Sequence, residues 1–243
     1  MRDVGEMMTN SSRIIYSEPI ANRVYNLIIQ DITDNHFNQG EKLIVRELCE
    51  RYGVSDTPVK QALSRLIADG IVENIPRKGM WVKRFTMDQL VDMYKARLMI
   101  EEYCIDSCIE LISKYDNVRK HFEDLINEYR QFIEDIGRKQ PTTEDYNKSE
   151  SLDIAFHYSI VACSNSPSIQ NLYDHLHTHI HLRLIRRPKE QTKMGSVCTG
   201  HERIYKYLIC GDAHQAKAAL REHFEAFFIE SGIDIGENSN KYE

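Results

Sequence analysis

The sequence predicts a mainly α-helical protein of two domains, a small N-terminal one with three helices and a β-hairpin and a larger C-terminal one built only from helices. Apolar residues recur every three or four positions through most of the chain, as on the buried face of a helix. Two short β-prone runs, IVENI and MWVKR, flank the turn PRKG. The chain has 243 residues, 42% hydrophobic and 28% charged, which suffices for two globular domains. We expect a flexible arm over residues 1–16, domains over 17–85 and 86–232, and a flexible tail over 233–243.

The composition argues against a membrane or secreted protein. No apolar run approaches the about 20 residues that a spanning helix needs, and the polar N-terminus lacks the apolar segment of a signal peptide. We therefore expect a cytoplasmic protein. The six cysteines form no CxxC pair, which favours buried free thiols over disulfides or a zinc ribbon. They are Cys49, Cys104, Cys108, Cys163, Cys198 and Cys210.

The net charge of −6 is unevenly distributed. The segment from Thr57 to Arg84 carries six basic residues against two acidic ones. A local positive stripe of this kind can bind phosphates even though the whole chain is acidic.

The first two helices are predicted from apolar periodicity and end signals. The first begins near Ser17, a candidate N-cap, with Pro19 in its first turn. Its apolar face holds Ile20, Val24, Leu27, Ile28 and Ile32. The short second helix has Val45, Leu48, Cys49 and Tyr52 on one face. Gly53 is placed to end it in a left-handed conformation.

The third helix is predicted from a capping Ser55 to a stop at Gly70, with Pro58 tolerated in its first turn. Its apolar face holds Val59, Ala62, Leu63, Leu66 and Ile67. Its other face is polar and holds Asp56, Thr57, Lys60, Gln61, Ser64 and Arg65, which can reach phosphates or base edges. With the basic hairpin, the three helices indicate a winged helix-turn-helix, whose third helix enters the major groove. The alternative is a generic α+β domain with a solvated polar face.

The run LIVRELCERYGVSDTPVKQALSRLIADGIVENIPRKGMWV resembles the DNA-binding domain of the GntR family of bacterial transcription regulators. That family reads roughly L-x-E-x-x-L, then G-V-S-R-T-P-V-R-E-A-L, then a wing with a glycine. Carried over by position, the resemblance implies operator contacts from Arg46, Ser55, Thr57, Lys60, Lys78 and Gly79. The polar face of the third helix adds Gln61 and Arg65 as candidates.

Two positions depart from the family pattern. Asp56 stands where the family usually has arginine, and this carboxylate repels phosphate but can accept from a cytosine amino group. Lys60 stands where the family has a second arginine, and it lacks the bidentate fork. The operator is therefore not expected to be the family's common one.

From Thr86 onward the pattern is helical. Thr86 and Gln89 form a predicted capping box, followed by apolar residues at Leu90, Met93, Ile100, Cys104, Cys108 and Leu111. Further helices are expected at about 117–139, 146–164, 167–187, 199–210 and 212–231. Asp212 is the expected N-cap of the last, with Gln215 as its capping-box partner.

The segment YDHLHTHIHLRL carries four histidines at alternating positions. They are His175, His177, His179 and His181. Because the surrounding apolar residues recur at helical spacing, the four separate into two i, i+4 pairs on different faces, and neither pair completes a metal site.

A better constellation combines residues distant in sequence. Asp153 and His157 are four apart on one helical face, and a helical hairpin through CGD brings His201 close to His223. Three imidazoles and a carboxylate suit a divalent transition metal, with zinc favoured and nickel, manganese or iron also compatible. Simple hydrogen bonding of core histidines is the alternative.

The C-terminal half resembles the FCD domain, the ligand-sensing domain of the FadR-type branch of the GntR family. The resemblance rests on Arg97 and Glu101, on Asp153 and His157 before ACSNSP, and on two later histidines. It implies that Asp153, His157, His201 and His223 are the metal ligands. Ser166 departs from the asparagine that the family tends to have before proline.

These observations predict a DNA-binding transcription regulator, a repressor rather than an activator, that is not an enzyme. The resemblance implies a homodimer on an operator, controlled by a small organic or sugar acid. Arg97 is the expected clamp for that acid, and a salt bridge to Glu101 is its alternative role. A metal-dependent hydrolase or oxygenase, a regulator that senses the metal itself, and a purely structural metal are the competing hypotheses.

Overall fold

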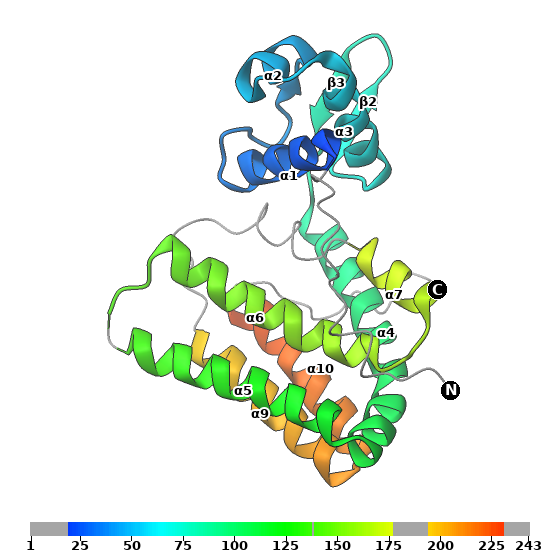
Figure 1. The fold of residues 1–243 in the computed structure, drawn as a ribbon, viewed down its shortest axis with the longest axis vertical. Coiled ribbons are helices and arrows are strands. Elements are labelled where there is room, and N and C mark those ends of the chain that lie inside the picture. The colour runs from blue at the N-terminus through cyan, green and yellow to red at the C-terminus, as the bar shows by residue number, and fades with distance from the viewer. Residues whose placement is uncertain (1–18, 138, 177–193, 231–243) are drawn as a thin grey trace. The chain divides into compact units, whose positions relative to one another are not determined.

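The computed structural model describes residues 19–137, 139–176 and 194–230. The chain divides into two compact units, Met1–Arg84 and Phe85–Glu243 (Figure 1). Helices predominate in both, which confirms the predicted fold class. The expected arm at 1–16, the N-cap Ser17 and the expected tail at 233–243 lie outside the described residues.

The first unit packs three helices, α1 (Ile20–Thr33), α2 (Val45–Tyr52) and α3 (Asp56–Ala68). Pro19 occupies the N-cap of α1 rather than its first turn. Ile20 and Leu27 are 56% and 40% exposed, so their predicted burial is wrong. Tyr25 is buried instead. Its hydroxyl donates a hydrogen bond of 2.7 Å to the carboxylate of Asp69, the C-cap of α3.

The ends of α2 and α3 follow the predicted signals in part. Gly53 ends α2 with φ 64°, a left-handed conformation in which glycine carries no steric penalty. Ser55 occupies the N-cap position of α3, but its hydroxyl makes no capping hydrogen bond. On α3, four of the five residues expected in the core are buried, and Ile67 is half-buried.

The predicted hairpin is β2 (Val72–Ile75) paired antiparallel with β3 (Gly79–Val82). In its register, Val72 lies opposite Val82 and Ile75 opposite Gly79. A third strand, β1 (Lys42–Leu43), pairs with the other edge of β3 and was not predicted, because two residues are too few to show alternation. Three helices with this small sheet form the winged helix-turn-helix.

The second unit is helical. Its elements are α4 (Met87–Lys114), α5 (Asp116–Ile136), α6 (Thr143–Ala162), α7 (Pro167–Asp174), α9 (Met194–Cys210) and α10 (Ala213–Glu230). The capping box of Thr86 and Gln89 at α4 is confirmed. Asp212 accepts the backbone N–H of Gln215 at 3.0 Å, as an N-cap does.

The bounds of α7 and α9 differ most from expectation. The helix expected over 167–187 is described only as α7, for which His175 is the C-cap, while His177, His179 and His181 lie outside the described residues. The helix expected from 199 begins at Met194, because the apolar Met194 and Cys198 are buried and extend its inner face.

The core of the second unit lies along α4, where Cys104, Ile105 and Cys108 are fully buried. α6 supplies Phe156 and Ile160 to the same core, and the antiparallel hairpin of α9 and α10 closes it (Figure 1). The long helices thus bring residues far apart in sequence together at the centre of the bundle.

All six cysteines are free, as predicted. Four are buried, Cys49 is half-buried and Cys210 is exposed, so the predicted burial is wrong for Cys210. Cys210 is the last residue of α9, directly before the turn at Gly211, which has φ 74°. Among the described helices, none is both long and apolar enough to cross a membrane.

Candidate metal centre and nucleic-acid interface

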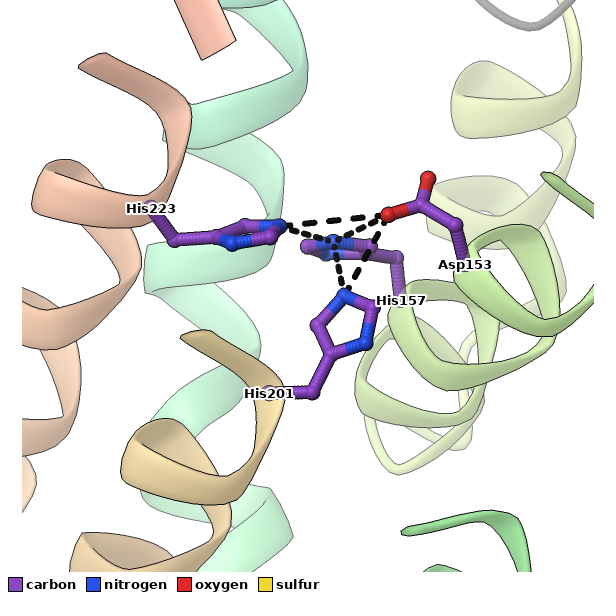
Figure 2. A group of neighbouring side chains, drawn as sticks. All are labelled: Asp153, His157, His201 and His223. Atoms are coloured by element: carbon purple, nitrogen blue, oxygen red, sulfur yellow. Dashed lines mark hydrogen bonds and ion pairs between the residues drawn. The ribbon is translucent and has the colours of Figure 1, made fainter. Parts of the chain in front are cut away.

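The structure brings together the four side chains that the sequence singled out in the C-terminal half. Asp153 and His157 project from α6, His201 from α9 and His223 from α10 (Figure 2). One donor atom from each residue lies within 4.8 Å of all the others, and within the described residues this is the one cluster that could hold a metal ion. Each of three helices therefore contributes to a single point inside the bundle.

The spacing of the donor atoms suits a small divalent cation. Nε2 of His157 lies 3.1 Å from Nε2 of His223 and 3.2 Å from Nε2 of His201. Oδ1 of Asp153 lies 3.2 to 3.9 Å from the same three nitrogens. Ligands bound at 2.0–2.1 Å in a tetrahedron are about 3.3 Å apart. Four of these five separations lie within about 0.2 Å of that value, and all four donor atoms lie within 4.8 Å of one another. The residues present therefore fit a transition metal with nitrogen and oxygen ligands.

Glu101 on α4 orients the first of these imidazoles. Its Oε2 lies 2.6 Å from Nδ1 of His157, and both side chains are buried. The carboxylate accepts the Nδ1–H, so Nε2 is the nitrogen whose lone pair is available to bind a cation. Carboxylates commonly support metal-bound histidines in this way. Sequence reasoning identified Glu101 only as a partner for Arg97, because nothing in the spacing links it to His157.

Arg97 neutralises Glu101. Its Nε donates to Oε1 of Glu101 at 2.8 Å and to the hydroxyl of Tyr173 at 2.9 Å, and that hydroxyl donates in turn to Glu101 at 2.7 Å. The salt bridge that was the alternative to an effector clamp is thus present, and Arg97 is 6% exposed. One terminal nitrogen, Nη2, still lies 3.8 Å from Oδ2 of Asp153, at the edge of the cluster.

The protonation of the cluster follows from burial and charge. Burial lowers the pKa of His201 and, together with the other two histidines, holds that of His223 well below its usual range. Burial acts to raise the pKa of Asp153, but His157, His201 and Arg97 hold it well below its usual range.

His157 behaves differently. Burial acts to lower its pKa, but the carboxylates of Glu101 and Asp153 raise it above its ordinary value. The same negative charges favour any cation at Nε2, a metal ion as much as a proton.

Gly200 lies against the imidazole of His223, which occupies the space that a Cβ would need. A Cβ at Gly200 would overlap Nδ1 of His223 and lie 3.2 Å from its Cγ. Gly200 belongs to the interior of α9, where glycine weakens a helix relative to alanine by about 0.5–1 kcal/mol. The close approach of the imidazole accounts for a glycine there, and no local sequence signal predicted it.

Of the four alternating histidines, His175 lies in the described part of the chain, and it does not belong to this cluster. His175 is exposed and its Nδ1 lies 2.6 Å from the backbone oxygen of Asn171. The prediction that they split into two pairs concerns residues mostly outside the described ranges.

The proposed DNA-reading side chains lie on the surface of the first unit. Arg46, Ser55, Thr57, Lys60, Gln61 and Lys78 are all exposed. Arg46 lies 3.0 Å from Glu50, and Lys60 lies 2.6 Å from Asp56, each within its own helix. Gly79 has φ 95° and approaches the Lys42 side chain, so the wing requires a glycine there.

Arg65 is held against α1. Its guanidinium lies 4.3 Å from the ring centre of Tyr25 and donates to Asn22 at 2.5 Å. These contacts join α3 to α1, so Arg65 has a structural role besides any contact with DNA.

Each of the two units matches a known protein family. Residues 20–82 match the family described as bacterial regulatory proteins, gntR family, and residues 92–226 match the FCD domain. The HTH-type transcriptional regulator LutR of Bacillus subtilis is 29% identical, covering 79% of this chain and 92% of that protein. A protein of Paenarthrobacter nicotinovorans named "Probable D-xylose utilization operon transcriptional repressor" is 21% identical, covering 90% and 92%. The solved structure of E. coli McbR/YncC shares the fold, with a TM-score of 0.65 at 19% identity over 88% of this chain and 97% of that one.

Proposed function

Because this chain belongs to the GntR family of bacterial regulatory proteins and carries an FCD domain, we propose that a small carboxylate metabolite controls its binding to an operator. The chain is a transcription regulator rather than an enzyme. The single observation that carries the proposal is the convergence of three imidazole nitrogens and one carboxylate oxygen inside the FCD domain. A site of that composition holds a divalent transition metal, with zinc favoured and nickel, manganese or iron compatible.

Different residues at that site bind the metal and the carboxylate. Asp153, His157, His201 and His223 hold the metal, and a bound divalent ion attracts an anionic oxygen ligand. Arg97 stands at the edge of the cluster and attracts the second oxygen of a carboxylate by charge. Asp153, whose side chain is 22% exposed, marks the side from which an effector reaches the centre. The relative named as a D-xylose utilization operon transcriptional repressor supports repression as the mode of control.

The first unit supplies the operator contacts. We assign them to Arg46, Ser55, Thr57, Lys60, Gln61 and Arg65 on the helices and to Lys78 and Gly79 in the wing. The free hydroxyl of Ser55 and the exposed ammonium of Lys60 support this assignment, because each is able to bind phosphate or a base edge. The protein works where the chromosome is, in the cytoplasm.

We also propose that the regulator is a homodimer. Met99 and Tyr103 lie one turn apart on α4 and are 65% and 69% exposed. Two large apolar side chains on one exposed helical face favour contact with another protein surface. A symmetric pair of DNA-binding domains suits a two-fold operator.

One observation favours a second candidate, a regulator that senses the metal itself. Four protein donors within 4.8 Å of one another are the number that completes the coordination of a structural zinc ion, which would leave no position for an effector. In that case free metal concentration, rather than a metabolite, controls operator binding.

Elemental analysis is the first test, made on the wild type and on a variant with both His201→Ala and His223→Ala. We expect near-stoichiometric transition metal in the wild type and little in the variant. Operator binding is then titrated with small organic acids at constant metal, and with metal alone. A response to an acid that the double variant lacks supports the carboxylate sensor, and a response to metal alone supports the metal sensor. Equal metal content in both proteins would refute the assignment of these ligands.

A further inference from the structure

The start of α3 presents a carboxylate and an ammonium side by side. Oδ2 of Asp56 and Nζ of Lys60 are 2.6 Å apart, and the two side chains are 57% and 63% exposed. They lie on the polar face of the helix together with Thr57, Gln61 and Ser64. In a winged helix-turn-helix, the first turns of the third helix are the part that reaches base edges.

A carboxylate at this position needs an explanation. DNA is lined with phosphates, and an exposed anion on the reading face opposes binding unless it finds a donor. Asp56 stays ionised, because the hydrogen bond and positive charge of Lys60 lower its pKa. In the major groove, the donors available to it are the amino groups of cytosine and adenine.

We propose that Asp56 and Lys60 together read one C·G base pair in each half of the operator, with Asp56 accepting from the cytosine amino group and Lys60 donating to O6 or N7 of the guanine. This inference rests on the proposed operator contacts of α3. The ion pair occupies Oδ2 of Asp56, while the Thr57 hydroxyl makes a long contact of 3.5 Å with Oδ1. The side chain is 57% exposed, so Oδ1 is able to accept a base amino group.

The pair matches a C·G edge better than an A·T edge. Guanine offers two adjacent acceptors to an ammonium, and its partner cytosine offers one donor beside them. An adenine amino group lies between two acceptors, so a carboxylate directed at it also faces the repulsion of N7 and of thymine O4. Because the ion pair already holds both side chains, less conformational freedom is lost when they meet the bases.

The competing interpretation is an ordinary ion pair on a helix surface, which would affect neither affinity nor sequence preference beyond its charge. Three variants of the full-length protein separate the two. Asp56→Asn keeps the shape and removes the charge, and Lys60→Ala removes the ammonium. Glu73→Gln removes one exposed negative charge from β2, outside the ion pair.

The experiment is selection of binding sites from a pool of randomised duplex DNA at fixed salt, followed by affinity measurements on the selected site and on single base-pair changes. For the wild type we expect one C·G pair per half-site whose replacement weakens binding roughly tenfold or more. Asp56→Asn should change the preference at that pair from C to A, because asparagine pairs with adenine. Lys60→Ala should reduce the discrimination at the same pair, and circular dichroism should show both variants folded.

Glu73→Gln should change affinity for all sequences alike and leave every preference in place. The inference is overturned if Asp56→Asn selects the same bases as the wild type, or if Asp56→Asn and Glu73→Gln have the same uniform effect. If the wild type itself enriches no sequence, the operator contacts of α3 are refuted, and the base-pair reading with them.

Discussion

Replacing Gly200 by alanine should remove metal binding while leaving the fold in place. The added Cβ would overlap Nδ1 of His223 and lie 3.2 Å and 3.3 Å from its Cγ and Cε1. Normal carbon contacts begin near 3.5 Å, so the imidazole must move by roughly 1 Å. Nε2 of His223 is 3.1 Å from Nε2 of His157. Any such movement of the imidazole therefore takes this nitrogen away from the position at which it could bind the same metal ion as the other donors.

The substitution affects the stability of α9 and the affinity for metal in opposite directions. Alanine in a helix interior is more favourable than glycine by about 0.5–1 kcal/mol, which stabilises α9. Metal–ligand distances tolerate only about 0.2 Å, so a displaced His223 no longer coordinates. Loss of a supporting contact alone lowers metal affinity about 10–100-fold, and loss of a ligand should exceed the upper end of that range.

Competition with a chromogenic chelator measures the affinity, and thermal unfolding of the metal-free protein measures stability. Gly195→Ala is the matched control, because Gly195 lies in the same helix and a Cβ there meets nothing within 4 Å. The control should bind metal as the wild type does. Gly200→Ala with wild-type metal affinity would refute the placement of His223 in the site.

Three further predictions concern other parts of the molecule. Glu101→Gln should lower metal affinity about 10–100-fold in the same chelator assay, because a neutral amide supports His157 less well than a carboxylate does. Asp31→Asn should lower the free energy of unfolding of the first unit by up to about 1 kcal/mol at neutral pH, because Asp31 loses its charge-assisted bond to the solvent-exposed Arg51. Burial acts to raise the pKa of Asp31, but its partners lower it overall, so this stabilisation is present above the unfolded-state pKa and should disappear as the pH falls through the lower folded-state value. Met99→Glu should weaken the dimer, as analytical ultracentrifugation over a concentration series would reveal.

Each of the three has a control. Glu102→Gln removes a neighbouring carboxylate that pairs with Arg221, and it should leave metal affinity unchanged. Asp34→Asn removes an exposed acid from the end of α1, and an equal loss of stability in that variant would contradict the role of Asp31. Ile209→Glu places a charge at an exposed apolar position of α9, and dimer loss in both glutamate variants alike would count against a specific contact on α4.

The helices and their ends were predictable because their signals are local. The capping box of Thr86 and Gln89 and the left-handed Gly53 depend on residues within one or two turns. The same holds for the hairpin around PRKG, whereas the two-residue strand β1 gave no pattern of its own. The exposure of Leu27 was not predicted, because helical periodicity identifies only the apolar face of a helix. How much of that face becomes buried depends on the elements that pack against the helix.

The sequence by itself determined the helices, the hairpin and the winged helix-turn-helix of the first unit, and it indicated four side chains of the second unit with the chemistry of a metal site. Only the tertiary structure placed Glu101 beside His157, 56 positions away, and Gly200 against His223. Helix formation is decided by interactions among residues a few positions apart, so the sequence displays it directly. Contacts between helices depend on how side chains interlock across the bundle, and that packing is settled by the whole core at once.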